Sequence, residues 1–207
     1  LMKKLLSTFI LCCLLLLAAC EQSMILETNL DIPQPIDITL PLNIAIFYEK
    51  SLREYVYTEN SDDRRNWAIT IGPSQIAIFD KVLPSIFSSI EIINNLDEAK
   101  YQDYDAVIVP EIKNIQFALP YETKTKIHET WIKYIIHIQE ADGEFITDLN
   151  LTGYGKSQPN TSIDFLLDER EGLVISTNEA YRDLAAKIIL SFQSDLTIKK
   201  WLDARFK

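Results

Sequence analysis

The segment GYGKS, Gly153 to Ser157, has the Gly-Lys-Ser order with which phosphate-binding loops end. Such a loop also needs a glycine five positions before the Gly-Lys pair, where this chain has Asn150. It needs a helix directly afterwards, so that backbone amides face the phosphate, but Pro159 predicts a loop there. We therefore expect no nucleotide binding, and we expect Gly153 and Gly155 to let a strand bend or bulge.

His128 and His137 are the only histidines, and they stand nine positions apart in a segment with the pattern of one strand. An odd spacing on a strand turns two side chains to opposite faces, so the pair is not expected to share a metal ion. We predict two partly exposed strand residues.

Serine hydrolase chemistry would need a serine, a histidine and an acid in register. No Gly-x-Ser-x-Gly turn is present, so nothing in the sequence nominates a nucleophile. Three acidic clusters lack the spacing of a calcium loop and are expected to be solvated. They are Asp62-Asp63, Asp97-Glu98 and the group Asp168, Glu169 and Glu171. The chain is thus predicted to be no enzyme and to use no metal or cofactor.

The remaining candidate is Cys20, which ends the apolar run from Leu5 to Ala19. A helix of that length spans about 22 Å, less than the ~30 Å hydrocarbon core of a bilayer. Lys3 and Lys4 before the run and small residues at its end are typical of a secretory signal, with a short membrane anchor as the alternative.

The ending LAAC, Leu17 to Cys20, resembles the lipobox of bacterial lipoproteins. The resemblance implies that residues 1–19 are a signal peptide removed before Cys20, and that Cys20 carries acyl chains and is the membrane contact. Several chains together make a long-lived anchor. Glu21 follows where an Asp would favour the inner membrane, so the periplasmic face of the outer membrane is favoured over the inner membrane.

The chain after residue 19 is acidic and holds no free thiol, because Cys12 and Cys13 lie in the signal. Removing Lys3 and Lys4 leaves 18 Lys and Arg against 30 Asp and Glu, a formal net charge of −12. Such a surface repels nucleic acid and anionic lipid, so no nucleic acid partner is expected.

Residues 20–42 are predicted to be the lipidated cysteine and a tether, since Pro33, Pro35 and Pro41 favour extended chain. In the alternative, four aliphatic residues within it form an edge strand. These are Ile32, Ile36, Ile38 and Leu40. Residues 43–207 are predicted to form one domain.

Within that domain, strands are expected at 43–48, 67–72 and 91–96. A helix is expected from Ser74 towards Ile90, and Pro84 is expected to kink it or to mark a break near Lys81. A further strand is expected around Pro110, which belongs at an edge or a bulge. On it, Val107 and Val109 are predicted to share a face with Ile115 and Phe117.

Asp142-Gly143 between two alternating segments predicts a long hairpin. The last long helix is predicted to begin at Ser176, which forms a capping box with Glu179. The fold class is therefore α+β, a single domain with an antiparallel or mixed sheet, a long central hairpin and two main helices on one face.

Aromatic residues near loops and strand ends are the candidate contacts for a partner, with Tyr55 and Tyr57 singled out. The alternative is that they belong to the core. An open sheet edge near Pro110 could accept a strand from the partner.

The order of elements resembles YajG-like small envelope lipoproteins and, loosely, the TolB amino-terminal domain. The resemblance rests on LAAC, on DAVIVPEI, on WIKYIIHIQEADGEFITDLNLTGYGK and on SDLTIKKWL. It implies an accessory role in the cell envelope without catalytic residues, so only Cys20 carries over. We expect a lipid-anchored accessory protein that binds another envelope component, with a periplasmic lipid- or small-molecule-binding or transport auxiliary as the alternative.

Overall fold

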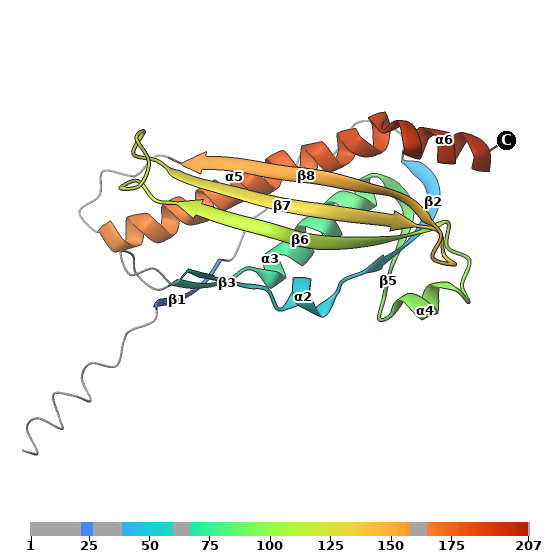
Figure 1. The fold of residues 1–207 in the computed structure, drawn as a ribbon, viewed down its shortest axis with the longest axis horizontal. Helices are drawn as coiled ribbons and strands as arrows, with labels where there is room; N and C mark the ends of the chain where they lie inside the picture. The colour runs from blue at the N-terminus through green and yellow to red at the C-terminus, as the bar shows by residue number, and fades with distance from the viewer. Residues whose placement is uncertain (1–21, 27–38, 60–66, 158–164, 207) are drawn as a thin grey trace, which may run out of the picture.

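The computed structural model describes residues 22–26, 39–59, 67–157 and 165–206 (Figure 1). The strands are β1 (Gln22–Ile25), β2 (Leu40–Phe47), β3 (Val56–Glu59), β4 (Trp67–Thr70), β5 (Phe87–Ile93), β6 (Ala106–Ala118), β7 (His128–Gln139) and β8 (Phe145–Ser157). The helices are α2 (Lys50–Arg53), α3 (Gly72–Val82), the 3-10 turn η1 (Leu83–Ser85), α4 (Leu96–Ala99), α5 (Phe165–Ser194) and α6 (Leu196–Arg205).

The main sheet has five strands in the order β5-β2-β6-β7-β8. β2 runs parallel to both of its neighbours, and the other pairs are antiparallel, so the sheet is mixed. β7 and β8 form the predicted hairpin, and Gly143 takes the positive φ of 96° that its turn requires. This confirms the predicted α+β fold.

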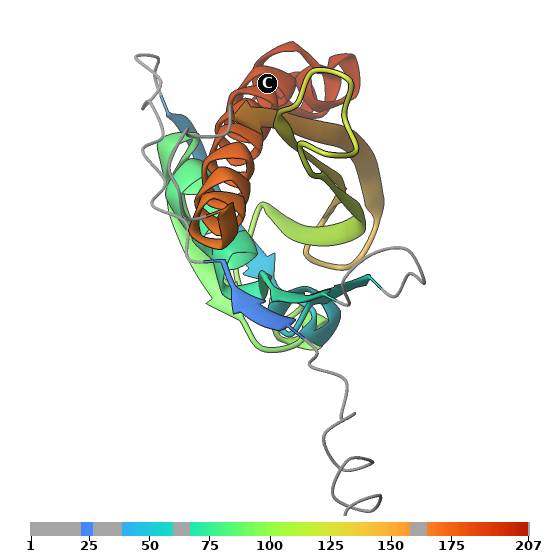
Figure 2. The same cartoon turned by 90° about the vertical axis from the view of Figure 1, so that its left-hand side faces the viewer.

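The helices α3 and α5 lie side by side over one face of this sheet (Figure 2). The face of β7 that turns towards them carries the predicted alternating residues Ile132, Tyr134, Ile136 and Ile138, all buried. The ring of Tyr134 packs edge-on against Phe79 of α3 at 5.4 Å. Burial of this alternating face contributes four side chains to the main core.

A second, three-stranded sheet has the order β1-β4-β3, which the sequence did not predict. Its first strand lies inside the segment expected to be a tether. Met24 and Leu26 are both buried on one side of the chain, and that alternation explains why residues 22–25 pair with β4 instead of extending into solvent. The aliphatic residues Ile32, Ile36 and Ile38 lie outside the described residues.

The helix expected to run towards Ile90 is shorter in the structure, because α3 ends at Val82 and η1 carries Pro84. Pro84 lacks the backbone N–H that an α-helix interior needs. The chain then enters β5 at Phe87, so Phe87 and Ile90 belong to a strand that pairs with β2. The predicted break is confirmed, and the helical assignment beyond it is wrong.

The expected faces of β6 are also wrong, because the register shifts between Ile112 and Asn114 and leaves Lys113 as an extra residue. One extra residue reverses which side chains face the core. Ile115 and Phe117 therefore join the main core, whereas Val107 and Val109 form a separate cluster under Tyr104 and α4. Pro110 lies just past the last β6 residue that pairs with β2, a local edge as predicted.

The long helix α5 begins at Phe165, eleven residues before the predicted start. Ser176 is inside the helix, where its hydroxyl donates to the carbonyl oxygen of Leu173 at 3.1 Å and contacts the Thr130 hydroxyl at 2.8 Å. A serine whose side chain bonds the preceding turn is a normal interior residue. The apparent capping box is thus a contact between α5 and β7.

Candidate functional site

The GYGKS segment lies on β8 in regular pairing with β7, with no register shift at Gly153 or Gly155. Neither the phosphate loop nor the expected bulge is present. Both glycines instead lie against α5, where a Cβ on Gly155 would stand 2.0 Å from the carbonyl oxygen of Ser176. The glycines serve the close approach of helix and strand.

The two histidines lie on opposite faces of β7, as predicted, but their surroundings differ. His128 is 1% exposed and packs against Gly172 of α5, so its expected partial exposure is wrong. No group of three or more potential metal ligands occurs among the described residues.

His137 lies on the outer face of the main sheet between two carboxylates from neighbouring strands. Its Nδ1 is 2.8 Å from Asp148 of β8, and its Nε2 is 3.0 Å from Glu111 of β6. Partial burial lowers the pKa of His137, but hydrogen bonds to Glu111 and Asp148 outweigh it, so the net shift is upward. Both ring nitrogens are engaged, and the arrangement ties three strands together.

The acidic residues of α4 also have structural partners. Asp97 pairs with Lys100 at 2.7 Å, and the backbone N–H of Glu98 donates to the side chain of Asn95, which caps the helix. Asp62 and Asp63 lie outside the described residues.

Tyr57 of β3 and Tyr55, which directly precedes β3, both pack against the main core. Tyr57 faces inward, with its ring 4.9 Å from Phe117 in an edge-on contact. The outer face of the main sheet carries another aromatic pair, Trp131 and Tyr154, whose rings are 5.3 Å apart. They stand directly opposite each other on β7 and β8, and an alignment of the two hairpin arms in the sequence could have predicted this pair.

The free edge of β8 is closed at two points by α5. The backbone N–H of Tyr154 donates to Asp183 at 2.8 Å, and Lys187 donates to the carbonyl oxygen of Thr152 at 2.7 Å. These contacts occupy groups that an added strand would need.

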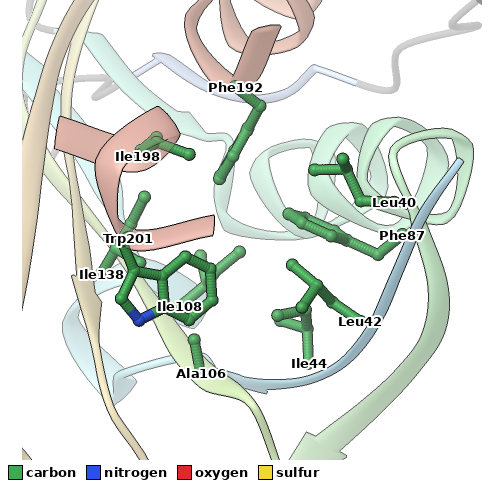
Figure 3. A pocket seen from close by; sticks show the side chains of 10 residues that line it. All are labelled: Leu40, Leu42, Ile44, Phe87, Ala106, Ile108, Ile138, Phe192, Ile198 and Trp201. Atoms are coloured by element: carbon green, nitrogen blue, oxygen red, sulfur yellow. The ribbon is translucent and has the colours of Figure 1, made fainter. Parts of the chain in front are cut away.

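An apolar chamber lies where α6 crosses the end of the main sheet (Figure 3). Its lining consists of Leu40, Leu42, Ile44, Phe87, Ala106, Ile108, Ile138, Phe192, Ile198 and Trp201. The cavity has a volume of about 10 Å³, barely enough for one water. With no polar lining to hold that water, the chamber is a narrow, dry crevice in the core.

The helix α6 covers this chamber and is held by apolar and polar contacts. Asp195 caps its first turn by accepting from Thr197 and Ile198. The indole N–H of Trp201 donates to Glu140 at 2.5 Å. Arg205 pairs with Asp105 at 2.7 Å and with Glu140 at 3.3 Å, and stacks over the Trp201 ring.

We expect Trp201→Ala to lower the free energy of unfolding by about 2 kcal/mol, because the indole fills the chamber wall. Arg205→Ala is expected to cost less than about 1 kcal/mol, since its ion pairs are partly solvated. Urea denaturation of the two variants gives both values. A larger loss for Arg205→Ala than for Trp201→Ala would mean that the ion pairs, and not the apolar contacts, hold α6.

Cys20 stands only two positions before Gln22, the first residue of β1. Two residues of extended chain span about 7 Å at most. An acyl chain on Cys20 would therefore hold β1 at the bilayer surface, without the long tether expected from the sequence. None of the helices in the described part of the chain is long and apolar enough to cross a membrane.

No family model matches the sequence, and no curated protein matches it. Among solved structures, a Xanthomonas campestris protein of the DUF330 family shares 8% identity at a TM-score of 0.53, over 89% of this chain and 99% of its own. A minor lipoprotein from Acinetobacter baumannii shares 12% identity at 0.44, over 79% and 96%. Lipoprotein B from Nitrosomonas europaea shares 12% at 0.39, over 78% and 90%. The first of these shows that the chain has the fold of the DUF330 protein.

Proposed function

We propose that this chain is a bacterial lipoprotein, anchored in the cell envelope by acylated Cys20, whose domain binds another envelope component and catalyses no reaction. The observation that carries the proposal is the apolar run that ends at LAAC, directly ahead of the first strand of the fold. A basic start, a short apolar segment and small residues before a cysteine meet the requirements of a lipoprotein signal. The outer membrane is the favoured location, because the cysteine is followed by Glu21 and not by the Asp that would favour the inner membrane.

The proposal of a binding role rests on the outer face of the main sheet. Over β7 and β8 this face carries Trp131 and Tyr154 beside charged residues, and tyrosine and tryptophan are favoured in protein interfaces. The side chains with potential chemistry have structural partners instead of a shared cleft: His137 joins three strands, and His128 packs against α5.

The alternative of a lipid or small-molecule carrier would need a lumen. The chamber beneath α6 has the apolar lining of one, but its volume of about 10 Å³ is too small for any carried molecule. The side chains of α3, α5 and α6 fill the space against the sheet. The crevice beneath α6 therefore has no room for a carried molecule, which favours binding through the surface over storage under this helix.

Metabolic labelling with a fatty-acid probe tests the anchor. The probe is expected to label the wild-type chain and to leave Cys20→Ser unlabelled, because no other cysteine remains after the signal. Cys13→Ser is the matched control, since it removes a thiol from the signal and should keep the label. Label on Cys20→Ser, or none on the wild type, would contradict the proposal.

A further inference from the structure

We propose that the outer face of the three-stranded sheet β1-β4-β3 rests on the lipid bilayer to which Cys20 is attached. The inference rests on the proposed acylation of Cys20 and adds a definite contact surface to it. Two independent observations lead to it: the chemistry of this face and its position in the chain.

The register of the small sheet defines its two faces. Ile25, Thr70 and Val56 stand in one row across the three strands, and Ala68 and Thr58 stand side by side in the next row on the same face. The opposite face carries Met24, Ile69 and Tyr57, and it packs into the core. Ile25 and Val56 keep 57% and 43% exposure although both are aliphatic, so the first face is the outer one.

The described side chains of this outer face carry no charge, although the chain after residue 19 has a formal net charge of −12. The outer face of the main sheet is different, since it carries Glu111, Lys113 and Asp148. Placing charged side chains against a bilayer costs desolvation, and acidic ones are also repelled by anionic lipids. Of the two outer sheet faces, the small sheet therefore offers the lower cost of contact.

The position in the chain leads to the same face. Cys20 stands two residues before β1, so the attachment point lies within about 7 Å of the first residue of this sheet. In both views β1 and β3 lie at the end of the molecule away from α6 (Figures 1 and 2). A domain held so closely must turn something towards the lipid, and the strand nearest the anchor belongs to the uncharged face.

This arrangement also sets the orientation of the rest of the molecule. With the small sheet on the bilayer, α6 points away from it, because the two lie at opposite ends. The inward-facing Tyr57 takes no part in the lipid contact, since it packs on Phe117. The exposed β-branched residues Ile25, Val56 and Thr58 would touch the lipid headgroups.

The experiment uses the acylated protein purified from membranes and placed in vesicles of phosphatidylethanolamine and phosphatidylglycerol. Thr58→Cys introduces one thiol on the outer face of the small sheet, and the chain after Cys20 has no other. An environment-sensitive fluorophore on this thiol is expected to emit at shorter wavelength when the protein is in vesicles than when the same protein is in buffer without lipid or detergent. Spin-labelled lipid should quench it several-fold more than the matched control, Thr152→Cys, an exposed threonine on β8.

Val56→Cys gives a second probe in the same face, and mass spectrometry of each sample shows whether acyl chains are present. Equal quenching at positions 56, 58 and 152 in acylated protein would overturn the bilayer contact and leave the anchor intact. A mass without acyl chains would overturn both the anchor and this inference. Stronger quenching at positions 56 and 58 than at 152 in acylated protein supports the inference.

Discussion

Replacing Gly155 with valine is expected to lower the free energy of unfolding by about 3 kcal/mol, near the upper end for an overpacked site. A Cβ at this position would lie 2.0 Å from the carbonyl oxygen of Ser176 and 2.3 Å from the backbone N of Ala180. Both atoms belong to the backbone of α5, which cannot move aside as a flexible side chain could. The helix would have to leave β8, and the contact between these two elements is among the most extensive in the fold.

Thr152→Val on the same strand is the matched control. It places the same side chain on the exposed face, where valine also favours the strand, so the change in unfolding free energy is expected to be small. Urea denaturation measures both variants. A loss for Gly155→Val no larger than that for Thr152→Val would show that α5 does not pack on β8 as described.

The hairpin of β7 and β8 could be predicted because its information is local. Apolar residues alternate on β7 from Ile132 to Ile138, and Asp142-Gly143 supplies the turn chemistry between the arms. The start of α5 could not be predicted from local sequence in this way. Ser176 and Glu179 match a capping box, but Ser176 bonds to Thr130 of β7, a residue 46 positions away.

The sequence did not predict which face of a strand a side chain occupies where an extra residue interrupts the two-residue repeat of the strand. The extra residue Lys113 in β6 moves Ile115 and Phe117 to the face opposite the one predicted, and nothing in the residue types marks it. The parallel pairing of β2 with β5 could not be predicted from local sequence either. Phe87 and Ile90 continue the helical spacing of α3 in the sequence, and only the sheet makes them strand residues.

The candidate anchor at Cys20 could be read from the sequence because a signal is recognised as an unfolded segment. Its distance from the folded domain could not. The proline-rich composition predicts a tether over residues 20–42, but β1 begins at Gln22, and Met24 and Leu26 bury their side chains. The same lack of tertiary information made Tyr57 a candidate surface contact, whereas it packs inward on Phe117.

The domain is expected to unfold steeply above pH 10, because three tyrosines buried in the main core keep their protons in the fold. Burial raises the pKa of Tyr48, Tyr134 and Tyr181 above the ordinary value of 10.0, and Tyr48 also donates to Asp80 at 2.7 Å. In the unfolded chain each tyrosine loses its proton near pH 10. As the pH rises further, the unfolded state binds fewer protons than the folded state, so the stability that these groups contribute below pH 10 is lost.

Each such tyrosine adds a slope of about 1.4 kcal/mol per pH unit, so the three together remove about 4 kcal/mol for each unit above pH 10. That is a large part of the ~5–15 kcal/mol that stabilises a typical domain. Urea denaturation at a series of pH values measures the slope. Tyr48→Phe should reduce the slope by about 1.4 kcal/mol per pH unit, because one titrating group is gone, even if loss of the Asp80 hydrogen bond lowers stability at neutral pH. Tyr101→Phe, at a side chain that is 87% exposed, should leave the slope unchanged. A slope that is equal in the wild type and in Tyr48→Phe would mean that Tyr48 ionises in the folded state, and its burial between β2 and α3 would be wrong.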